Sequence, residues 1–150
     1  MTSLRMKAVQ AVLKQVMEVH IAFNKHLGLK VESFDPQAPK LRFDMRPELV
    51  GNPLLKILHG GVISAALDVA GGFAIMLQIA SNDIEITAAK FPKLGTIDLR
   101  VDYLRPGRGK HFIATAKIVR KGSRISVVHM ELHNDAGELI ATGGGAYVVG

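Results

Sequence analysis

The spacing of hydrophobic and polar residues changes several times along the chain, and each change predicts a new structural element. From about residue 4 to residue 24, apolar residues recur every three or four positions, at Val9, Leu13 and Met17 among others, with charged residues between them. Apolar residues at that spacing form one face of a helix. The sequence therefore predicts an amphipathic N-terminal helix.

Shorter, alternating segments follow this helix. Residues 27–31 alternate in polarity, starting from Leu27, and residues 41–46 alternate apolar with charged side chains. A period of two residues is typical of a strand with one buried face. Residues 47–55 interrupt the pattern with a Gly-Asn-Pro turn signal, so they are predicted to be an irregular connection.

The second half of the chain predicts an antiparallel sheet. In the first of its strands, Ile97 shares an apolar face with Leu99 and Val101. Turn signals at 121–123 and 134–137 separate the later runs, which is typical of successive hairpins. The segment between the central region and this sheet, residues 81–94, has no clear period and is predicted to be a loop or short lid. The predicted strands are 97–103, 111–120, 124–133 and 138–149.

The stretch between the two halves, HGGVISAALDVAGGFAIMLQIA (59–80), is apolar on every side of a helix and carries one carboxylate, Asp68, at its centre. Its length would allow it to cross a membrane. A central aspartate costs about 3 kcal/mol in a membrane span, however, and predicted strands lie on both sides. A sheet of about five strands that wraps around this helix explains the pattern better, which gives an α+β fold.

Length and composition narrow the possible functions. The 150 residues suit one domain, 1–150, and contain no cysteine, which excludes disulfides and thiolate chemistry. The N-terminus lacks the apolar core and cleavage site of a secretory signal, so a cytoplasmic location is expected. The net charge is +6, but aromatic residues make up 5% and no nucleic-acid-reading motif is present. We expect neither a nucleic acid nor a membrane as partner.

One cluster raises the question of a metal site. His129, Glu131 and His133 alternate along a predicted strand and therefore share one face. Imidazole and carboxylate groups bind zinc, but the exposed face of a strand also requires polar residues. With no further ligand in the pattern, no metal is predicted.

Two segments together resemble a known family. One is His59-Gly60-Gly61, with Asp68 nine residues after the histidine; the other is GTIDLRVDYLRPGRG, residues 95–109. They resemble hotdog-fold acyl-CoA thioesterases of the PaaI-like type, and most of all their YigI-type branch, described as acting on medium- and long-chain acyl-CoA. The resemblance covers roughly residues 20–149. It implies a hotdog fold, in which a curved antiparallel sheet wraps a central helix, and hydrolysis of a thioester to coenzyme A and a carboxylic acid, with no other cofactor.

The resemblance also implies roles for individual residues. His59 is expected to shape the site and its hydrogen bonds. Thr96 stands where family members have a serine or threonine that positions the water, usually from the partner subunit. Asn52 is the candidate for an asparagine that the family places just before the His-Gly-Gly stretch, although it lies one position too far upstream.

The chemistry of such a site follows from helix geometry. Backbone N–H groups at a helix N-terminus are unpaired and partly positive, and Gly60 and Gly61 have no side chains to block a substrate. Their N–H groups are predicted to form the oxyanion hole of the reaction, which is worth on the order of 3 kcal/mol per donor. Asp68 is the predicted general base or nucleophile; the sequence leaves both open.

The basic residues offer contacts for the phosphates of coenzyme A, since the planar guanidinium group suits phosphate. They lie beside two predicted breaks in the sheet, around Gly107 and Gly122. The candidates are Arg105, Arg108, Arg120, Lys121 and Arg124.

Other functions remain open at this stage. A hotdog hydratase would need an Asp-x-Asn-Pro-x-His run, but Val50 and Leu55 occupy the positions of its two catalytic residues. A module that binds acyl-CoA without cleaving it is an alternative, and so is a thioesterase acting on acyl-carrier-protein or aryl-CoA thioesters. The resemblance further implies a homo-oligomer, a dimer or a dimer of dimers.

Overall fold

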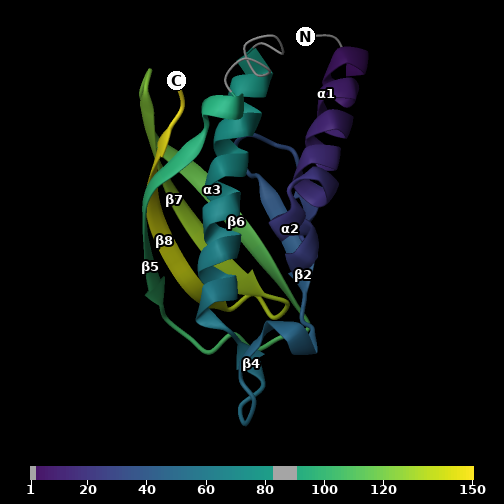
Figure 1. Ribbon diagram of the computed structural model, residues 1–150, viewed down its shortest axis with the longest axis vertical. Coiled ribbons are helices and arrows are strands. Elements are labelled where there is room, and N and C mark those ends of the chain that lie inside the picture. The colour runs from purple at the N-terminus through teal and green to yellow at the C-terminus, as the bar shows by residue number, and fades with distance from the viewer. Residues whose placement is uncertain (1–2, 83–90) are drawn as a thin grey trace.

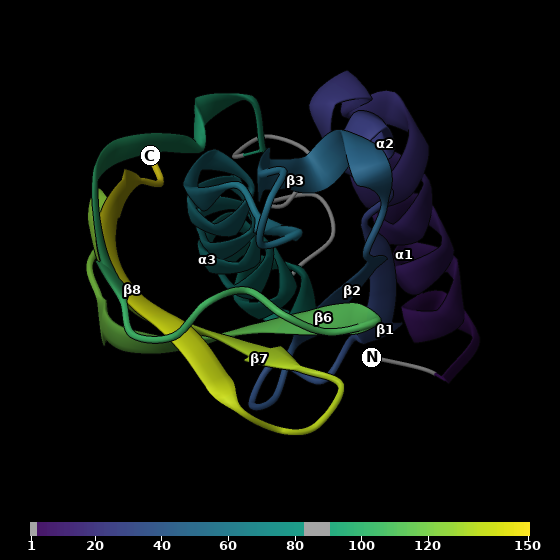
Figure 2. The same ribbon diagram turned by 90° about the horizontal axis from the view of Figure 1, so that it is seen from below.

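A long helix, α3 (Gly60–Asn82), lies at the centre of the molecule and a curved antiparallel sheet wraps around it (Figure 1). The structure is a computed structural model and describes residues 3–82 and 91–150. Figure 2 looks along α3 and shows the strands curving around it, with the N-terminal helices beside it near β1 (Lys30–Ser33) and β2 (Lys40–Asp44). This arrangement confirms the predicted α+β hotdog fold.

Six strands of the described segments form one sheet in the order β1-β2-β6-β7-β8-β5, which agrees with the prediction of about five, and β3 (Val50–Asn52) and β4 (Ile57–Leu58) form a separate two-stranded sheet. Strands β6, β7 and β8 follow one another as hairpins, as the two turn signals predict, and β5 pairs with the far side of β8. Every pairing is antiparallel, and β5 is left as an edge strand. The bounds are Lys30–Ser33 for β1, Lys40–Asp44 for β2, Gly95–Tyr103 for β5, His111–Lys121 for β6, Ile125–Asn134 for β7 and Leu139–Val148 for β8.

The apolar character of α3 is explained by its packing against this sheet. Ala66, Leu67 and Phe73 on its inner face are fully buried. Strand β8 allows the close approach, because a Cβ on Gly143 would lie 3.3 Å from Leu67 Cδ1. By length and composition alone α3 could cross a membrane, but its inner side forms the core of the fold.

The predicted helix 4–24 is divided into three parts, which corrects the expectation of one continuous helix. They are α1 (Ser3–Gln15), a π-helical turn (Val16–His20) and α2 (Ala22–Leu27). The interruption is at Ile21, whose backbone is extended. The carboxylate of Glu18, in the π-helical turn, is buried and accepts hydrogen bonds from Lys14 Nζ and the Val31 N–H, both 2.9 Å long. These bonds tie the π-helical turn to β1.

Two further expectations differ from the structure. Leu27 is the last residue of α2 and not part of a strand, because Gly28 adopts a left-handed conformation (φ 74°) that ends the helix. The connection 47–55 is more regular than predicted, with a 3₁₀ turn followed by a small hairpin. Its elements are the turn Pro47–Leu49 and the strands β3 (Val50–Asn52) and β4 (Ile57–Leu58).

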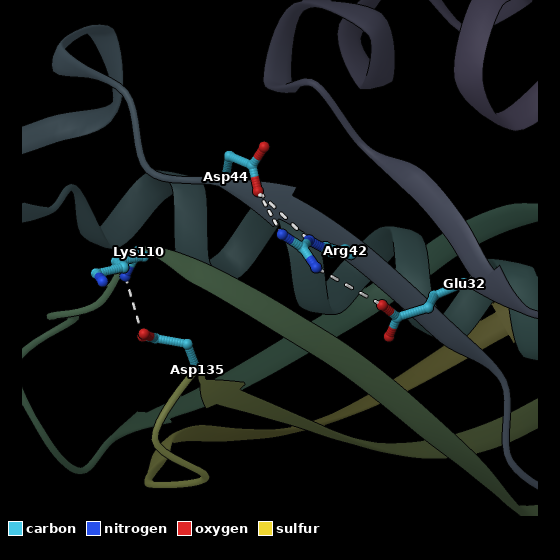
Figure 3. A network of polar contacts seen from close by, with 5 residues as sticks. All are labelled: Glu32, Arg42, Asp44, Lys110 and Asp135. Carbon is cyan, nitrogen blue, oxygen red and sulfur yellow. Dashed lines mark hydrogen bonds and ion pairs between the residues drawn. The ribbon is translucent and has the colours of Figure 1, made fainter.

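The outer face of the sheet carries polar side chains that pair with one another. Figure 3 shows Arg42 between two carboxylates, 3.2 Å from Asp44 and 4.0 Å from Glu32. Beside them, the Lys110 N–H donates to Asp135 Oδ1 at 3.0 Å, which lowers the pKa of that carboxyl group. In β2 this polar face alternates with the buried side chains of Leu41 and Phe43 on the opposite face.

The predicted loop 81–94 falls mostly outside the described residues. The end of α3 extends to Asn82, and residues 83–90 are not described. Phe91–Lys93 form a 3₁₀ turn that leads directly into β5.

Candidate active site

Asp68 is held by two hydroxyl groups that reach it from the sheet. Its Oδ1 atom accepts hydrogen bonds from Thr96 Oγ1 on β5, at 2.8 Å, and from the Tyr147 hydroxyl on β8, at 3.0 Å. The threonine belongs to the same chain, which differs from the expectation that it reaches in from the partner subunit. Among the described residues no hydrogen bond reaches the second oxygen, Oδ2. The carboxylate is therefore fixed through one oxygen, and the other is left for chemistry.

A β-bulge in β5 brings Thr96 to this position. Thr96 lies opposite Tyr147 in the ladder, but Asp98 lies opposite Ala146, so Ile97 is an extra residue. Side chains alternate along a strand, so one inserted residue exchanges the faces on its two sides. Thr96 consequently faces α3, while Asp98 turns outward and its Oδ1 accepts the Ala146 N–H at 2.8 Å. The prediction that Ile97 shares the inner apolar face is wrong: its side chain is 55% exposed.

Tyr147 is a site residue that the sequence analysis missed. It is 2% exposed, and its hydroxyl lies 3.0 Å from Asp68 Oδ1 and 2.9 Å from the Asp68 carbonyl oxygen. Burial, followed by the negative charge of Asp68, raises the pKa of Tyr147 far above its ordinary value, so the hydroxyl remains a donor. The sequence could have indicated this role, because Tyr147 falls on the inner face of a predicted strand and a buried hydroxyl group needs a hydrogen-bond partner.

The carboxylate opens into a pocket of about 400 Å³ between α3, β5 and the N-terminal segment. Met17 and Ile21, at the irregular part of the N-terminal helices, form one wall. The pocket walls are largely apolar. The described lining residues are Met17, Ile21, Asn24, Asp68, Val69, Gly72, Met76, Phe91, Leu94, Gly95, Thr96 and Tyr147.

At the start of α3, His59 and the two glycines have different roles. His59 Nδ1 accepts the Gly61 N–H at 2.8 Å, which caps the helix. The Gly60 N–H makes no hydrogen bond within the described part of the chain. Of the two predicted oxyanion donors, therefore, Gly60 is free and Gly61 is already engaged. Tyr103 packs over Gly60 and donates to its carbonyl oxygen at 3.0 Å.

The Gly60 N–H and the Asp68 carboxylate lie far apart within one chain. Eight positions separate Gly60 from Asp68 along α3, which corresponds to roughly 12 Å of helix axis. One thioester carbonyl cannot contact both groups at that separation.

Asn52 lies in the small hairpin before α3. Its Oδ1 accepts the N–H groups of Leu54 and Leu55, at 3.0 and 3.1 Å, and so stabilises the turn between β3 and β4. These contacts give Asn52 a structural role, and a part in catalysis remains a prediction.

The five basic candidates form two groups at opposite ends of α3. Arg105 and Arg108 lie near the start of the helix, and their guanidinium groups donate to the carbonyl oxygens of Leu139 and Leu55. The other group, Arg120, Lys121 and Arg124, surrounds the β6–β7 turn, and Lys121 lies beside Gln78 and Ile79 near the end of α3. The structure does not bring all five together in one chain.

The histidine row on β7 has the predicted alternation. Glu131 lies 3.9 Å from His129 Nε2 and 3.8 Å from His133 Nε2, on the outer face of the sheet. Within the described ranges 3–82 and 91–150, no three histidine or acidic side chains are placed to hold a metal ion.

Comparison with known proteins decides the family. Residues 55–141, from the small hairpin to the start of β8, match the model of the thioesterase superfamily. The chain belongs to the thioesterase superfamily. The matched region contains both Asp68 and Thr96, and Tyr147 lies just beyond it.

The relatives of this thioesterase include a curated enzyme and solved structures. The medium/long-chain acyl-CoA thioesterase YigI of Escherichia coli K12 is 42% identical over 87% of each chain. A Shewanella oneidensis protein related to the thioesterase superfamily is 40% identical, with a TM-score of 0.91 over the full length of both chains. A Bacillus halodurans protein crystallised with CoA is 26% identical, with a TM-score of 0.65, over 96% of this chain and 84% of that one.

Proposed function

We propose that this protein hydrolyses medium- and long-chain acyl-CoA thioesters, with Asp68 as the catalytic residue. The observation that carries the proposal is a carboxylate fixed by Thr96 and Tyr147 in a largely apolar pocket, with a second oxygen that no hydrogen bond from residues 3–82 or 91–150 reaches. The similarity to YigI supports the substrate class. An apolar pocket beside a carboxylate suits a substrate that joins an acyl chain to a reactive carbonyl.

The proposed reaction uses Oδ2, the second carboxylate oxygen of Asp68. As a general base, Oδ2 takes a proton from water while the water oxygen bonds to the thioester carbon. The resulting tetrahedral oxyanion collapses, the C–S bond breaks, and the thiolate leaves and takes up the proton. The products are a carboxylic acid and CoA. Thr96 and Tyr147 keep Oδ1 occupied and prevent rotation of the carboxylate during these steps.

Direct attack by Asp68 is the second route, in which a mixed anhydride forms and water then hydrolyses it. A single turnover in ¹⁸O-labelled water distinguishes the two. The general-base route places the label in the fatty acid alone. The anhydride route, when water attacks the aspartyl carbon, places it in Asp68.

The oxyanion donor in this proposal comes from a second chain. The roughly 12 Å between Gly60 and Asp68 prevents both from serving one carbonyl, whereas two α3 helices packed antiparallel would place Gly60 of one protomer near Asp68 of the other. A surface for such packing is present. On α3, Val62, Ala65 and Val69 are only partly buried. Beside them lies β5, an edge strand followed by Leu104, which is 50% exposed.

Hybrid dimers test the two-chain site. Asp68→Asn and Gly60→Pro are each expected to be inactive alone, since proline has no N–H to donate. When the two are unfolded and refolded together in equal amounts, half the dimers are hybrids with one intact site, so about a quarter of wild-type activity should return. If each site lies within one chain, mixing restores nothing, and a sedimentation mass of a single chain would also contradict the proposal.

The phosphates of CoA are assigned to the two basic groups. Arg105 lines a pocket with Gly60 at the start of α3, and Lys121, on the same β6–β7 turn as Arg124, lines one with Ile79 near the end of α3. In an antiparallel pair, one group from each chain would approach the same site. Arg105→Ala and Arg124→Ala are expected to raise KM for acyl-CoA about tenfold with little change in kcat, because a phosphate contact far from the carbonyl contributes equally to the ground and transition states.

Thiol release from acyl-CoAs of graded chain length tests the function directly. Asp68→Asn should lower kcat/KM at least 100-fold. The matched control is Asp102→Asn, which removes a β5 carboxylate that pairs with Arg100 on the surface. Binding of acyl-CoA without release of thiol by the wild type would refute hydrolysis and favour a binding module. Release from acyl-carrier-protein alone would refute the CoA assignment.

A further inference from the structure

A second apolar pocket lies beneath the N-terminal helix, beyond the one that contains Asp68. Its volume is about 430 Å³. It is enclosed by α1, the end of α3 and the segment that follows β1. The described lining residues are Met6, Val9, Gln10, Leu13, Phe34, Asp35, Pro36, Leu77 and Ala80. Seven of these nine are apolar, and the carboxylate of Asp35 is turned to the Gln37 N–H, at 2.9 Å.

The two pockets are lined by neighbouring residues of the same two segments, although no described residue lines both. On the N-terminal segment, Met17 lines the pocket of Asp68 and Leu13, one turn earlier, lines the second pocket. On α3, Met76 lines the first and its neighbour Leu77 lines the second. All four side chains belong to one buried cluster, and two of the four are methionines. Methionine side chains have several rotatable bonds and adapt readily to a neighbouring ligand.

The distance between Asp68 and Leu77 along α3 indicates how long an acyl chain must be to reach the second pocket. Nine positions separate Asp68 from Leu77, or roughly 14 Å of helix axis. An extended alkyl chain advances about 1.25 Å per carbon, given bonds of about 1.5 Å. A chain of roughly eleven carbons therefore reaches the level of Leu77, which lines the second pocket, and a longer chain extends beyond it.

We propose that the second pocket binds the distal end of long acyl chains, and that Leu13, Met17, Met76 and Leu77 form the gate between the pockets. This inference rests on the proposed acyl-CoA thioesterase function and assigns its chain-length selection to the N-terminal helix. Medium chains are accommodated in the Asp68 pocket alone. Chains longer than about twelve carbons displace the gate and occupy both pockets.

Filling the second pocket tests the assignment through activity. Gln10 is half-buried on its wall, and Gln10→Trp places an indole there without altering a fully buried position. The matched control, Val12→Trp, adds the same side chain to the same helix at a site that is 63% exposed. Gln10→Trp should lower kcat/KM for palmitoyl-CoA at least tenfold and change that for octanoyl-CoA less than twofold. Val12→Trp should leave both values unchanged.

A spectroscopic experiment locates the chain independently of turnover. The protein contains no tryptophan, so Phe34→Trp creates a single fluorophore in the second pocket. A non-hydrolysable thioether analogue of palmitoyl-CoA that carries bromine at the terminal carbon should quench it. The corresponding octanoyl analogue, and the long analogue added to Val12→Trp, should not.

The outcomes separate this inference from the proposed function. If Gln10→Trp lowers activity equally for every chain length, or for none, or if the long analogue fails to quench Phe34→Trp, the second pocket does not bind the acyl chain. If the wild type releases no thiol but the quenching depends on length as expected, the pocket assignment stands and hydrolysis is refuted.

Discussion

Tyr147 reaches Asp68 because Gly71, one turn further along α3, has no side chain. A Cβ atom on Gly71 would overlap the tyrosine hydroxyl and lie 2.8 Å from Cζ. The glycine lies on a helix in which almost any other residue would be more stable by propensity. Its presence is explained by the hydroxyl that it admits, and the pair Gly71–Tyr147 thus fixes the orientation of the Asp68 carboxylate.

Tyr147→Phe removes the hydroxyl and keeps the ring. We expect kcat to fall roughly tenfold with little change in KM, since a hydrogen bond to a charged group contributes about 1.5–3 kcal/mol and this one orients the base without touching substrate. Steady-state kinetics with one medium-chain acyl-CoA measures the effects on kcat and on KM separately. A rise in KM at constant kcat would contradict a positioning role and indicate a contact with substrate.

Alanine substitutions at two neighbouring glycines of α3 should change the free energy of unfolding in opposite directions. Gly71→Ala should lower the free energy of unfolding by more than 1 kcal/mol, because the added methyl group displaces Tyr147. Gly72→Ala should raise it by about 0.5–1 kcal/mol, because the one described atom that its Cβ would meet is Leu94 Cδ2, at 4.0 Å. Urea titration of both variants checks the pair. Equal effects would mean that Tyr147 does not depend on the space at Gly71.

The free N–H of Gly60 can be removed with little cost to the helix. Proline is favoured at the first helical position, so Gly60→Pro should fold, yet it should lower kcat about 100-fold through loss of an oxyanion donor. Gly60→Ala is the control that keeps the N–H and still adds a Cβ, 3.4 Å from the Tyr103 ring. A similar loss in both variants would attribute the effect to crowding by the added carbon.

Glu18 should make stability depend on pH. Burial alone would raise the pKa of Glu18, but the hydrogen bonds from Lys14 and Val31 outweigh it, and the pKa lies below its ordinary value of 4.5. The carboxylate therefore stabilises the fold above pH 4.5, and this contribution is lost as the pH falls through the lowered value. Glu18→Gln should cost about 1–2 kcal/mol at pH 7, and the cost should shrink as the pH is lowered below 4.5. A series of denaturant titrations between pH 7 and pH 2 checks this, and a cost independent of pH would show that the charge is irrelevant.

Much of the fold was predictable because its strongest signals are local. An apolar segment of some twenty residues with a central Asp68 must be covered by something, and the alternating strands after it supply the cover. The π-helical turn at Val16–His20 was not predicted, and its Glu18 carboxylate accepts a hydrogen bond from Val31, on a strand thirteen residues further along the chain. The spacing of apolar and polar residues within the helix does not predict such a long-range contact.

The site was predictable only in part for the same reason. Asp68 stands out because a charge in an apolar helix is unusual, whereas Tyr147 is ordinary until the sheet places it opposite Thr96. His59 and Gly61 look like neighbours with separate roles, but the hydrogen bond between them removes one predicted oxyanion donor. Which backbone groups stay free is a property of the folded helix end.

The bulge at Ile97 also has a consequence for how the gene can vary. Thr96 and Asp98 lie opposite the consecutive residues Tyr147 and Ala146, and Ile97 between them has no partner in the ladder. A substitution at Ile97, whose side chain is largely exposed, leaves this pairing intact. Deletion of Ile97 would make Thr96 and Asp98 adjacent in a regular ladder, so Thr96 would still face α3 and Asp98 would still face outward. Position 97 should therefore tolerate both substitution and deletion without loss of the Thr96–Asp68 hydrogen bond.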